Sequence, residues 1–155
     1  MAIVHGCELP QELYYHVEED TWARLEEDGT ATVGMTSVAA TRAGKILYVS
    51  PKKMGKAISR GKSVGTVESN KWVGPVPSPL SGKVVAVNET LKKQGIWINK
   101  DPYGAGWIVR LRPSHLSEEL AGLLTGPEAI ESYRAKIELQ NILCIQCAEE
   151  LEEAK

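Results

Sequence analysis

Lys71 is the residue with the strongest case for carrying chemistry. It lies near the centre of the segment 67–82, which a strand-like run enters and a Gly/Pro-rich run leaves. Three prolines between positions 75 and 79 fix φ and stiffen the return path. The pattern predicts a lysine that stands out from a rigid turn into water. Taken alone, such a lysine is most often an ordinary exposed side chain.

A second candidate is the pair Cys144 and Cys147, which share a face if this region is helical. Two interpretations stay open: small buried apolar residues, or a redox or sulfur-carrying pair. Cys7 is a weaker third candidate. An odd number of cysteines argues against a disulfide framework. Three cysteines and three scattered histidines also lack the clustered spacing of a zinc site, so no metal is expected.

Other motifs of catalysis or ligand binding are missing from the chain. There is no Ser/His/Asp order, P-loop or GxGxxG, and Gly104–Gly106 is better interpreted as a turn. A net charge of −2 makes nucleic acid an unlikely partner, and no apolar run approaches a membrane span. The N-terminus has no basic region followed by an apolar stretch, so we expect no secretory signal and a cytoplasmic protein.

The charge is distributed unevenly along the 155 residues. Seven basic residues and no acidic one lie between Arg42 and Lys62, whereas five glutamates lie from Glu138 onward. The simplest interpretation of both runs is solvated surface. The alternative is a docking surface that steers a partner of opposite charge.

The elements that must position Lys71 are short strands separated by turns, between Tyr15 and Arg112. Apolar and β-branched content predicts strands at Thr30–Met35, Lys45–Val49, Val64–Val67, Lys83–Val87 and Trp107–Leu111. Ser50-Pro51 and Pro113 are expected to end two of them. A short helical turn is predicted over Ser37–Arg42.

Two of these strands look like copies of one another. Ala43–Val49 and Leu80–Val87 each contain Gly-Lys followed by an apolar strand, and they flank residues 67–79. A two-fold repeat of strands implies two half-sheets that bury each other's apolar faces. The expected fold is mainly β, a two-sheet sandwich.

The C-terminal part has helical character. Gly126-Pro127-Glu128 is typical of a helix start, and a short helix is expected over 114–122. Apolar residues at three- and four-residue steps predict an amphipathic helix of about 20 or more residues that packs on the domain or on a partner. These steps run through Ile130, Tyr133, Ile137, Cys144, Cys147 and Leu151. We therefore divide the chain into an N-terminal segment (1–14), a carrier domain (15–113) and a helical extension (114–155).

The segment around Lys71 resembles a known family. Glu68-Ser69-Asn70-Lys71, followed by Ser78-Pro79-Leu80-Ser81-Gly82, is similar to the lipoylation segment of glycine cleavage H proteins. Thr30–Thr36 and Asn99–Trp107 agree with the family in order, and the resemblance covers roughly Tyr15 to Arg112. It implies an antiparallel lipoyl/biotinyl-type sandwich, a barrel-sandwich hybrid with a quasi-two-fold axis. It also implies lipoic acid joined through an amide to Lys71, with Glu68, Ser69, Asn70 and Trp72 as the surroundings that lipoylating enzymes recognise.

In such a protein the cofactor supplies the chemistry and the chain supplies presentation. The arm ends in a cyclic disulfide that opens under thiolate or carbanion attack. The resemblance therefore implies a carrier rather than an enzyme. Its implied partners are a lipoate ligase or other lipoylating enzyme, dihydrolipoamide dehydrogenase, and the enzymes that use the arm.

Departures from the family point to a narrower relationship. Trp72-Val73-Gly74-Pro75 stands where H proteins usually have small residues, and Gly34–Ala40 also differs. These blocks resemble lipoate-binding proteins of the sulfur-oxidising, heterodisulfide-reductase-like pathway. The first hypothesis is thus a carrier of sulfur intermediates or reducing equivalents for a cytoplasmic heterodisulfide reductase-like complex. Trp72 would pack on the domain, cover the arm or meet a partner.

Three alternatives remain at this point. One is a glycine cleavage H protein that carries an aminomethyl group between the P, T and L proteins. Another is an unmodified binding module. A biotin carrier is disfavoured, because that family has Met beside its lysine and here the neighbours are Asn70 and Trp72.

Overall fold

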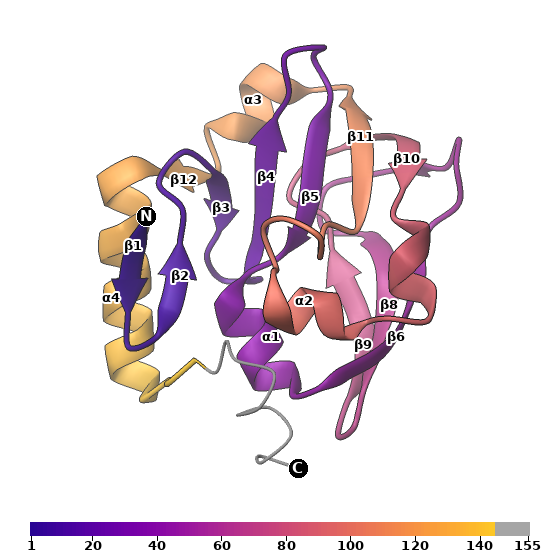
Figure 1. The fold of residues 1–155 in the computed structure, drawn as a ribbon. Helices are drawn as coiled ribbons and strands as arrows, with labels where there is room; N and C mark the ends of the chain where they lie inside the picture. Colours follow the sequence, from indigo (N-terminus) through magenta and orange to yellow (C-terminus); the bar gives the residue numbers. More distant parts are fainter. Residues whose placement is uncertain (145–155) are drawn as a thin grey trace.

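The computed structural model describes residues 1–144, and antiparallel sheets dominate it (Figure 1). The larger sheet has the order β12-β3-β4-β5-β11-β10-β7 and the smaller has the order β6-β8-β9. The larger sheet consists of β3 (Tyr14–His16), β4 (Thr21–Leu25), β5 (Ala31–Met35), β7 (Ala57–Ile58), β10 (Gly82–Val87), β11 (Val109–Pro113) and β12 (Leu124–Thr125). The smaller consists of β6 (Ile46–Pro51), β8 (Ser63–Ser69) and β9 (Val73–Pro77). A separate hairpin is formed by β1 (Ala2–Val4) and β2 (Cys7–Leu9).

The main core lies between the larger and the smaller sheet. Val33, Val84 and Leu111 from the larger sheet join Val49 and Val67 from the smaller one in a single buried cluster. Along β8, buried and exposed positions alternate from Val67 to Ser69, as expected for a strand with one face on a core. This arrangement confirms the predicted two-sheet sandwich.

The internal repeat places one copy in each sheet. β6 belongs to the smaller sheet and β10 to the larger one. Each copy contains a register irregularity at the corresponding place, between Ile46 and Tyr48 in β6 and between Val84 and Ala86 in β10. Because a bulge bends the strand, the two copies bend at equivalent points.

Pro51 and Pro113 end β6 and β11 as predicted, and each is the last residue of its strand. β6 is an edge strand, where a missing N–H donor costs no ladder hydrogen bond. Pro113 is paired with Gly82 at the end of its ladder, where the same reasoning applies.

The helices are short except for the last one. They are α1 (Ser37–Ala43), the 3-10 helix η1 (Glu89–Lys92), α2 (Ile96–Lys100), α3 (Leu116–Leu120) and α4 (Gly126–Gln140). Predicted helices at 37–42 and 114–122 are therefore present as α1 and α3. Within residues 1–144, no helix is both long and apolar enough to cross a membrane.

The predicted extent of the last helix is wrong. α4 has 15 residues and ends at Gln140, because Asn141 adopts the left-handed conformation (φ 58°, ψ 44°). The chain then turns back, and Ile142 and Cys144 are buried against the domain. The apolar periodicity continues past the helix end because these residues pack in a turn rather than on a helix face. Leu151 lies outside the described residues.

A second core connects both ends of the chain to the sandwich. It contains Val4 and Leu9 of the N-terminal hairpin, Tyr15 and Trp22 of the larger sheet, and Tyr133 of α4. Tyr15 and Tyr133 meet edge to face, with ring centroids 5.5 Å apart. α4 therefore packs on the domain, which answers the question that the sequence left open.

Candidate functional site

The hairpin of β8 and β9 holds Lys71 at its tip (Figure 1). Cross-strand pairs Val67–Gly74 and Glu68–Val73 bring the chain to a turn over residues 69–72. The backbone N–H of Ser69 donates to the Trp72 carbonyl at 2.7 Å, which closes this turn. Lys71 is exposed, as the proline-stiffened segment predicts.

Ser69 fixes the backbone on both sides of Lys71. Its hydroxyl donates to the Trp72 carbonyl at 3.2 Å and accepts from the Lys71 N–H at 3.2 Å. The Ser69 residue is 7 % exposed. The next residue, Asn70, donates its N–H to the Lys45 carbonyl at 3.0 Å, which ties the turn to the start of β6.

Gly44 allows the stem of Lys71 to lie close to the end of α1. A Cβ at Gly44 would be 2.9 Å from Lys71 Cε and 2.8 Å from Asn70 Oδ1. Gly44 also has φ +86°, a conformation that favours glycine. Its N–H donates to the Ala40 carbonyl and caps α1.

A groove of about 620 Å³ lies beside Lys71. Its walls are the loop and strand start at 18–21, one side of α1, and the hairpin residues 71–72 and 75–77. Glu18, Glu19 and Asp20 supply acidic groups, and Arg42 supplies a basic one. A flexible group attached to Lys71 could therefore fold back into a cleft of its own domain.

Asp20 anchors the wall of this groove to α4. Its Oδ1 accepts from Lys136 Nζ at 2.7 Å and from the Tyr133 hydroxyl at 3.2 Å. Its Oδ2 lies 3.8 Å from an Arg42 guanidinium nitrogen. Burial raises the pKa of Asp20 above its ordinary value, although Lys136 and the hydrogen bonds act in the opposite direction.

Thr21 is a groove residue that the sequence did not single out. Its hydroxyl is buried and has no hydrogen-bond partner within the described part of the chain. A buried hydroxyl without a hydrogen-bond partner costs stability. Thr21 lines the groove only because α1 and the β8–β9 hairpin pack beside its strand. No local sequence signal marks it as a groove residue.

Trp72 packs on the hairpin and remains accessible. A Cβ at Gly74 would clash with its indole ring, so the ring lies directly on the β9 backbone. Trp72 is still 41 % exposed and lines the groove. Trp72 therefore packs on the domain, which was one of the three interpretations, and covering the arm or meeting a partner stays a prediction.

The remaining hairpin residues of the predicted site face outward. Glu68 is exposed on β8, and its cross-strand neighbours are Tyr48 on β6 and Val73 on β9. Asn70 is exposed at the tip. The structure thus brings Glu68, Ser69, Asn70, Lys71 and Trp72 together on one accessible hairpin.

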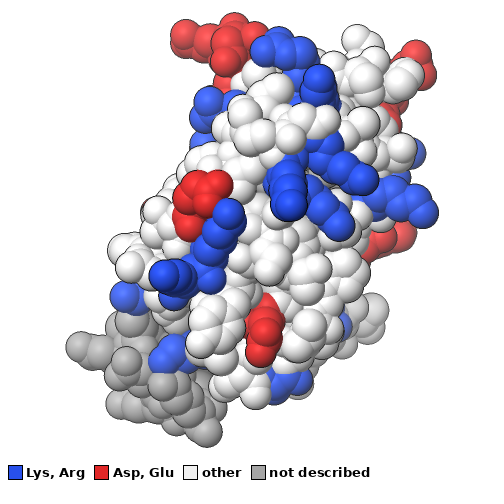
Figure 2. Space-filling view, turned by 90° about the vertical axis from the view of Figure 1, so that its right-hand side faces the viewer, with Lys and Arg blue, Asp and Glu red and all other residues white. Residues whose placement is uncertain are grey.

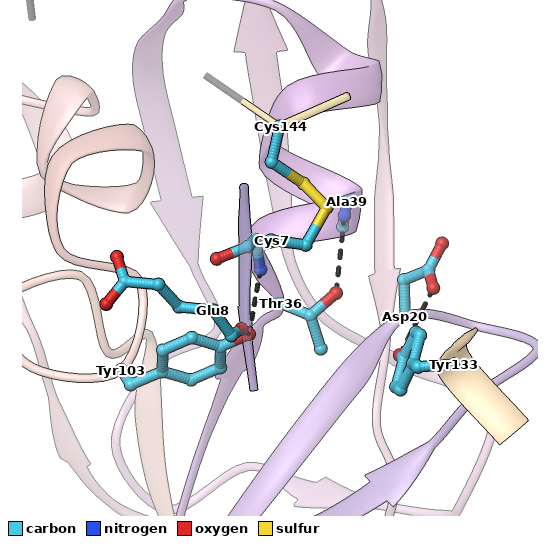
Figure 3. The surroundings of a disulfide bond; sticks show 9 residues. Cys7, Glu8, Asp20, Thr36, Ala39, Tyr103, Tyr133 and Cys144 are labelled. Atoms are coloured by element: carbon cyan, nitrogen blue, oxygen red, sulfur yellow. Dashed lines mark hydrogen bonds between the residues drawn. A yellow bond between two sulfur atoms is a disulfide. The ribbon is translucent and has the colours of Figure 1, made fainter. Parts of the chain in front are cut away.

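The cysteine predictions need correction. Cys144 forms a disulfide with Cys7, with Cα atoms 4.8 Å apart, so the expectation of unpaired cysteines is wrong for these two (Figure 3). Cys144 also lies beyond the end of α4, so it is not on a face of that helix. Cys147 lies outside the described residues. Counting cysteines could not reveal the pairing, which depends on the chain after α4 returning to the N-terminal hairpin.

The disulfide is structural in its setting. Cys7 is fully buried, Cys144 is 7 % exposed, and both belong to the second core. The Cys144 N–H donates to the His5 carbonyl at 3.0 Å. Among the residues that the structure describes, no three His, Cys, Asp or Glu side chains gather as metal ligands.

An antiparallel two-sheet sandwich that presents an exposed lysine on a tight hairpin defines a carrier domain of the lipoyl type. The family model described as "Glycine cleavage H-protein" matches residues 13–136. The chain belongs to this family, whose members are carriers rather than enzymes and hold lipoic acid covalently on a lysine.

Individual relatives cover nearly the whole chain. Glycine cleavage system H protein 2 of Aquifex aeolicus is 45 % identical over 139 residues, which are 90 % of this chain and 86 % of the relative. The probable H protein 2 of Saccharolobus solfataricus is 44 % identical over 146 residues, 93 % and 98 % of the two chains. The crystal structure of the H protein from Mycobacterium marinum has a TM-score of 0.71 and 33 % identity, and covers 81 % of this chain and 98 % of that one.

Proposed function

We propose that the protein carries lipoic acid on Lys71 and works as a swinging-arm carrier. The observation that supports this most is the exposed Lys71 side chain at the tip of a hairpin whose backbone Ser69 fixes on both sides. An amide between Lys71 Nζ and the lipoyl carboxyl group removes the lysine charge and leaves a long flexible arm. Tethering raises the effective concentration of its dithiolane at each partner site.

The chain's own residues have separate tasks in this proposal. Glu68, Asn70 and Trp72 surround Lys71 and are the side chains that a lipoylating enzyme would contact. Gly44 leaves room for the lysine stem. The groove beside Lys71 offers the head of the arm a place out of bulk water.

The first candidate cargo is an aminomethyl group, carried between the P, T and L proteins of glycine cleavage. The family and the names of the relatives support it. The groove also supports it, because the Glu18 and Glu19 carboxylates in its wall would favour a cationic amine once amide formation has removed the Lys71 charge.

The second candidate cargo is a sulfur intermediate or a pair of reducing equivalents, delivered to a heterodisulfide reductase-like complex. Its specific support is the bulky Trp72, 41 % exposed beside the lysine. Aquifex aeolicus contains relatives named H protein 2, 3 and 5. Several H proteins in one organism leave room for a copy with another cargo.

Intact mass spectrometry of the lipoylated protein separates the candidates. The protein with its arm in the oxidised, cyclic disulfide form is offered glycine with its decarboxylase, because the disulfide must open to accept the aminomethyl group. The protein with its arm reduced is offered a sulfane-sulfur donor in a separate reaction. An aminomethyl mass gain supports the first cargo, and a sulfur mass gain supports the second. Lys71→Ala is the control and should show neither. If the wild-type protein is not lipoylated by an active lipoylating system, it is an unmodified binding module and the proposal fails.

A further inference from the structure

A group of five lysines forms a basic patch on the side of the molecule next to β7 and β10. We define the lysine patch as Lys52, Lys53, Lys56, Lys62 and Lys83. Four of its members come from the basic run in the sequence, and the fold adds Lys83 from β10. Figure 2 shows Lys and Arg side chains gathered on the upper part of this face, with few acidic groups among them.

The fold brings these lysines together through backbone pairing. Lys83 is the cross-strand partner of Ala57, the residue after Lys56. The Val84 N–H donates to the Lys56 carbonyl at 2.9 Å, and the Lys52 N–H donates to Val64, close to Lys62. The patch therefore lies in one region, in the loops that join β6 to β7 and β7 to β8 and on the adjoining β10.

The patch is not neutralised by the protein itself. None of the five lysines forms an ion pair within residues 1–144, although acidic side chains elsewhere give the whole chain a net charge of −2. Lys83 is moreover paired across the ladder with Arg112. Like charges directly opposite each other destabilise a sheet, so this arrangement costs stability that a partner's carboxylates would restore.

The same face carries two exposed apolar side chains next to the hairpin tip, Tyr48 and Val73, which flank Glu68 and which we call the apolar row. Tyr48, Glu68 and Val73 are aligned across β6, β8 and β9, and Tyr48 and Val73 are 54 % and 63 % exposed. Exposed aromatic side chains of this kind are typical of the centres of protein interfaces.

Strand β8 connects the two features. It begins directly after Lys62 and contains Glu68. At the usual rise of a strand, these two residues lie about 20 Å apart. One interface of ordinary size, burying about 800 Å² on each partner, spans both.

We propose that this face is the docking surface for the enzymes whose active sites receive Lys71 or its arm, and that these enzymes carry an acidic surface beside the active-site entrance. The inference rests on the proposed function, because it assumes that Lys71 must enter an enzyme. The lysine patch steers the acidic surface, and the apolar row forms the apolar contact beside the hairpin tip. A protein fits this face better than a polyanion, because the apolar row adjoins the patch and the chain is acidic overall.

The test compares two charge reversals of equal size. The patch variant is Lys56→Glu/Lys83→Glu. The control variant is Lys93→Glu/Lys100→Glu, which alters two exposed lysines of the η1–α2 region and changes the net charge equally. Both are made in a Lys71→Ala background, so that association is measured without any modification of the lysine. The probe is the cognate lipoylating enzyme, which must meet this hairpin whichever cargo the arm carries.

The measured quantity is the association rate constant at about 50 mM and about 500 mM NaCl. We expect the patch variant to associate about 10-fold more slowly than the Lys71→Ala parent at low salt, and the control variant to stay within about two-fold. The difference should largely vanish at high salt. Equal rates for the two variants, or slowing that persists at high salt, would overturn the docking surface.

Two further readings keep the conclusions separate. The intact mass of the wild-type protein after the lipoylation reaction tests whether lipoic acid is attached to Lys71. If no lipoyl group is found, the proposed function fails, whereas the association rates still test the docking surface. A DNA duplex of about 20 base pairs serves as a polyanion probe. Duplex binding that the patch variant loses, together with unchanged enzyme association, would reassign the patch to nucleic acid and overturn the protein partner.

Discussion

At the scale of single residues, the presentation of Lys71 depends on neighbours that do no chemistry. Ser69 holds the backbone on both sides of the lysine through one hydroxyl. Ser69→Ala removes these two hydrogen bonds and should cost about 1 kcal/mol in the free energy of unfolding. Because the turn is also loosened, the rate of lipoylation should fall several-fold.

A time course of intact mass, together with urea unfolding, measures both effects. Ser50→Ala is the matched control, since Ser50 is exposed on β6 of the same sheet. A Ser69→Ala protein that is lipoylated at the wild-type rate would show that the hydroxyl stabilises the turn without positioning the lysine.

Gly44 provides a second residue-scale prediction. Gly44→Ala meets both an unfavourable φ and contacts with Lys71 and Asn70. Gly29 has the same φ of +86° but nothing within 4 Å of a Cβ. Gly29→Ala should therefore cost about 1 kcal/mol from the backbone alone. Gly44→Ala should cost more and should also slow lipoylation. Equal losses in urea unfolding would show that the space over Gly44 is not needed.

The site was predictable from the sequence where its signals are local. Glu68 to Trp72 are consecutive residues, and the prolines that follow them predict a stiff hairpin. Thr21 and Asp20 were not predictable as groove residues, because they line the groove only through the packing of α1 and the hairpin beside them. The local sequence around a hairpin tip does not indicate which residues from other parts of the chain will line a groove beside it.

At the scale of elements, the ion pair between Lys136 on α4 and Asp20 links the helix to the groove wall. The two side chains are only 11 % and 9 % exposed. Removing one partner of a buried pair leaves an uncompensated charge. Lys136→Ala should therefore lower the free energy of unfolding by roughly 3 kcal/mol at neutral pH.

The deficit of Lys136→Ala should depend on pH in a defined direction. Burial raises the pKa of Asp20 in the folded protein, and loss of the lysine raises it further. The folded variant then takes up a proton at a higher pH than the unfolded chain does. Its deficit should shrink as the pH falls through the folded pKa toward the unfolded value of about 4. Urea unfolding across this range measures it, with Arg134→Ala as the surface control. A loss of unfolding free energy that grows as the pH falls would contradict the predicted direction of the pH dependence.

Helix ends were harder to predict than helix starts. Gly126-Pro127-Glu128 marked the start of α4 correctly. The end at Gln140 depends on Asn141, an ordinary polar residue that here takes a left-handed conformation. The apolar steps continue beyond it because Ile142 and Cys144 pack into the same core without being helical. Periodicity reports burial, and burial alone does not distinguish a helix from a returning turn.

At the scale of the whole molecule, the sandwich follows from the repeat, whereas the second core does not. The Gly-Lys copies indicated two half-sheets, and β6 and β10 occupy them. The meeting of the N-terminal hairpin with α4 is a contact between the two ends of the chain. Such a contact leaves no periodic pattern in the sequence. The odd number of cysteines argued against a disulfide, so the bond that joins the N-terminal hairpin to the chain after α4 was not predicted.

That disulfide should contribute strongly to the stability of the whole protein. Cys7 and Cys144 are separated by 137 positions, so the bond closes almost the entire described chain into one loop. In the chain-entropy view, a loop of this length stabilises the folded state by roughly 2–5 kcal/mol. The wild-type protein should lose about this much free energy of unfolding when a reductant is added.

The Cys7→Ser variant is the matched control for the reductant. It should already have the lower stability and should not respond to reduction. The lipoyl dithiolane also reacts with reductants, so the comparison is made on unlipoylated protein by urea unfolding. Because Lys71 belongs to the hairpin and not to the second core, the rate of lipoylation at room temperature should be nearly the same with and without the bond. A wild-type protein whose stability is unchanged by reductant would show that the second core holds the two ends together by packing alone.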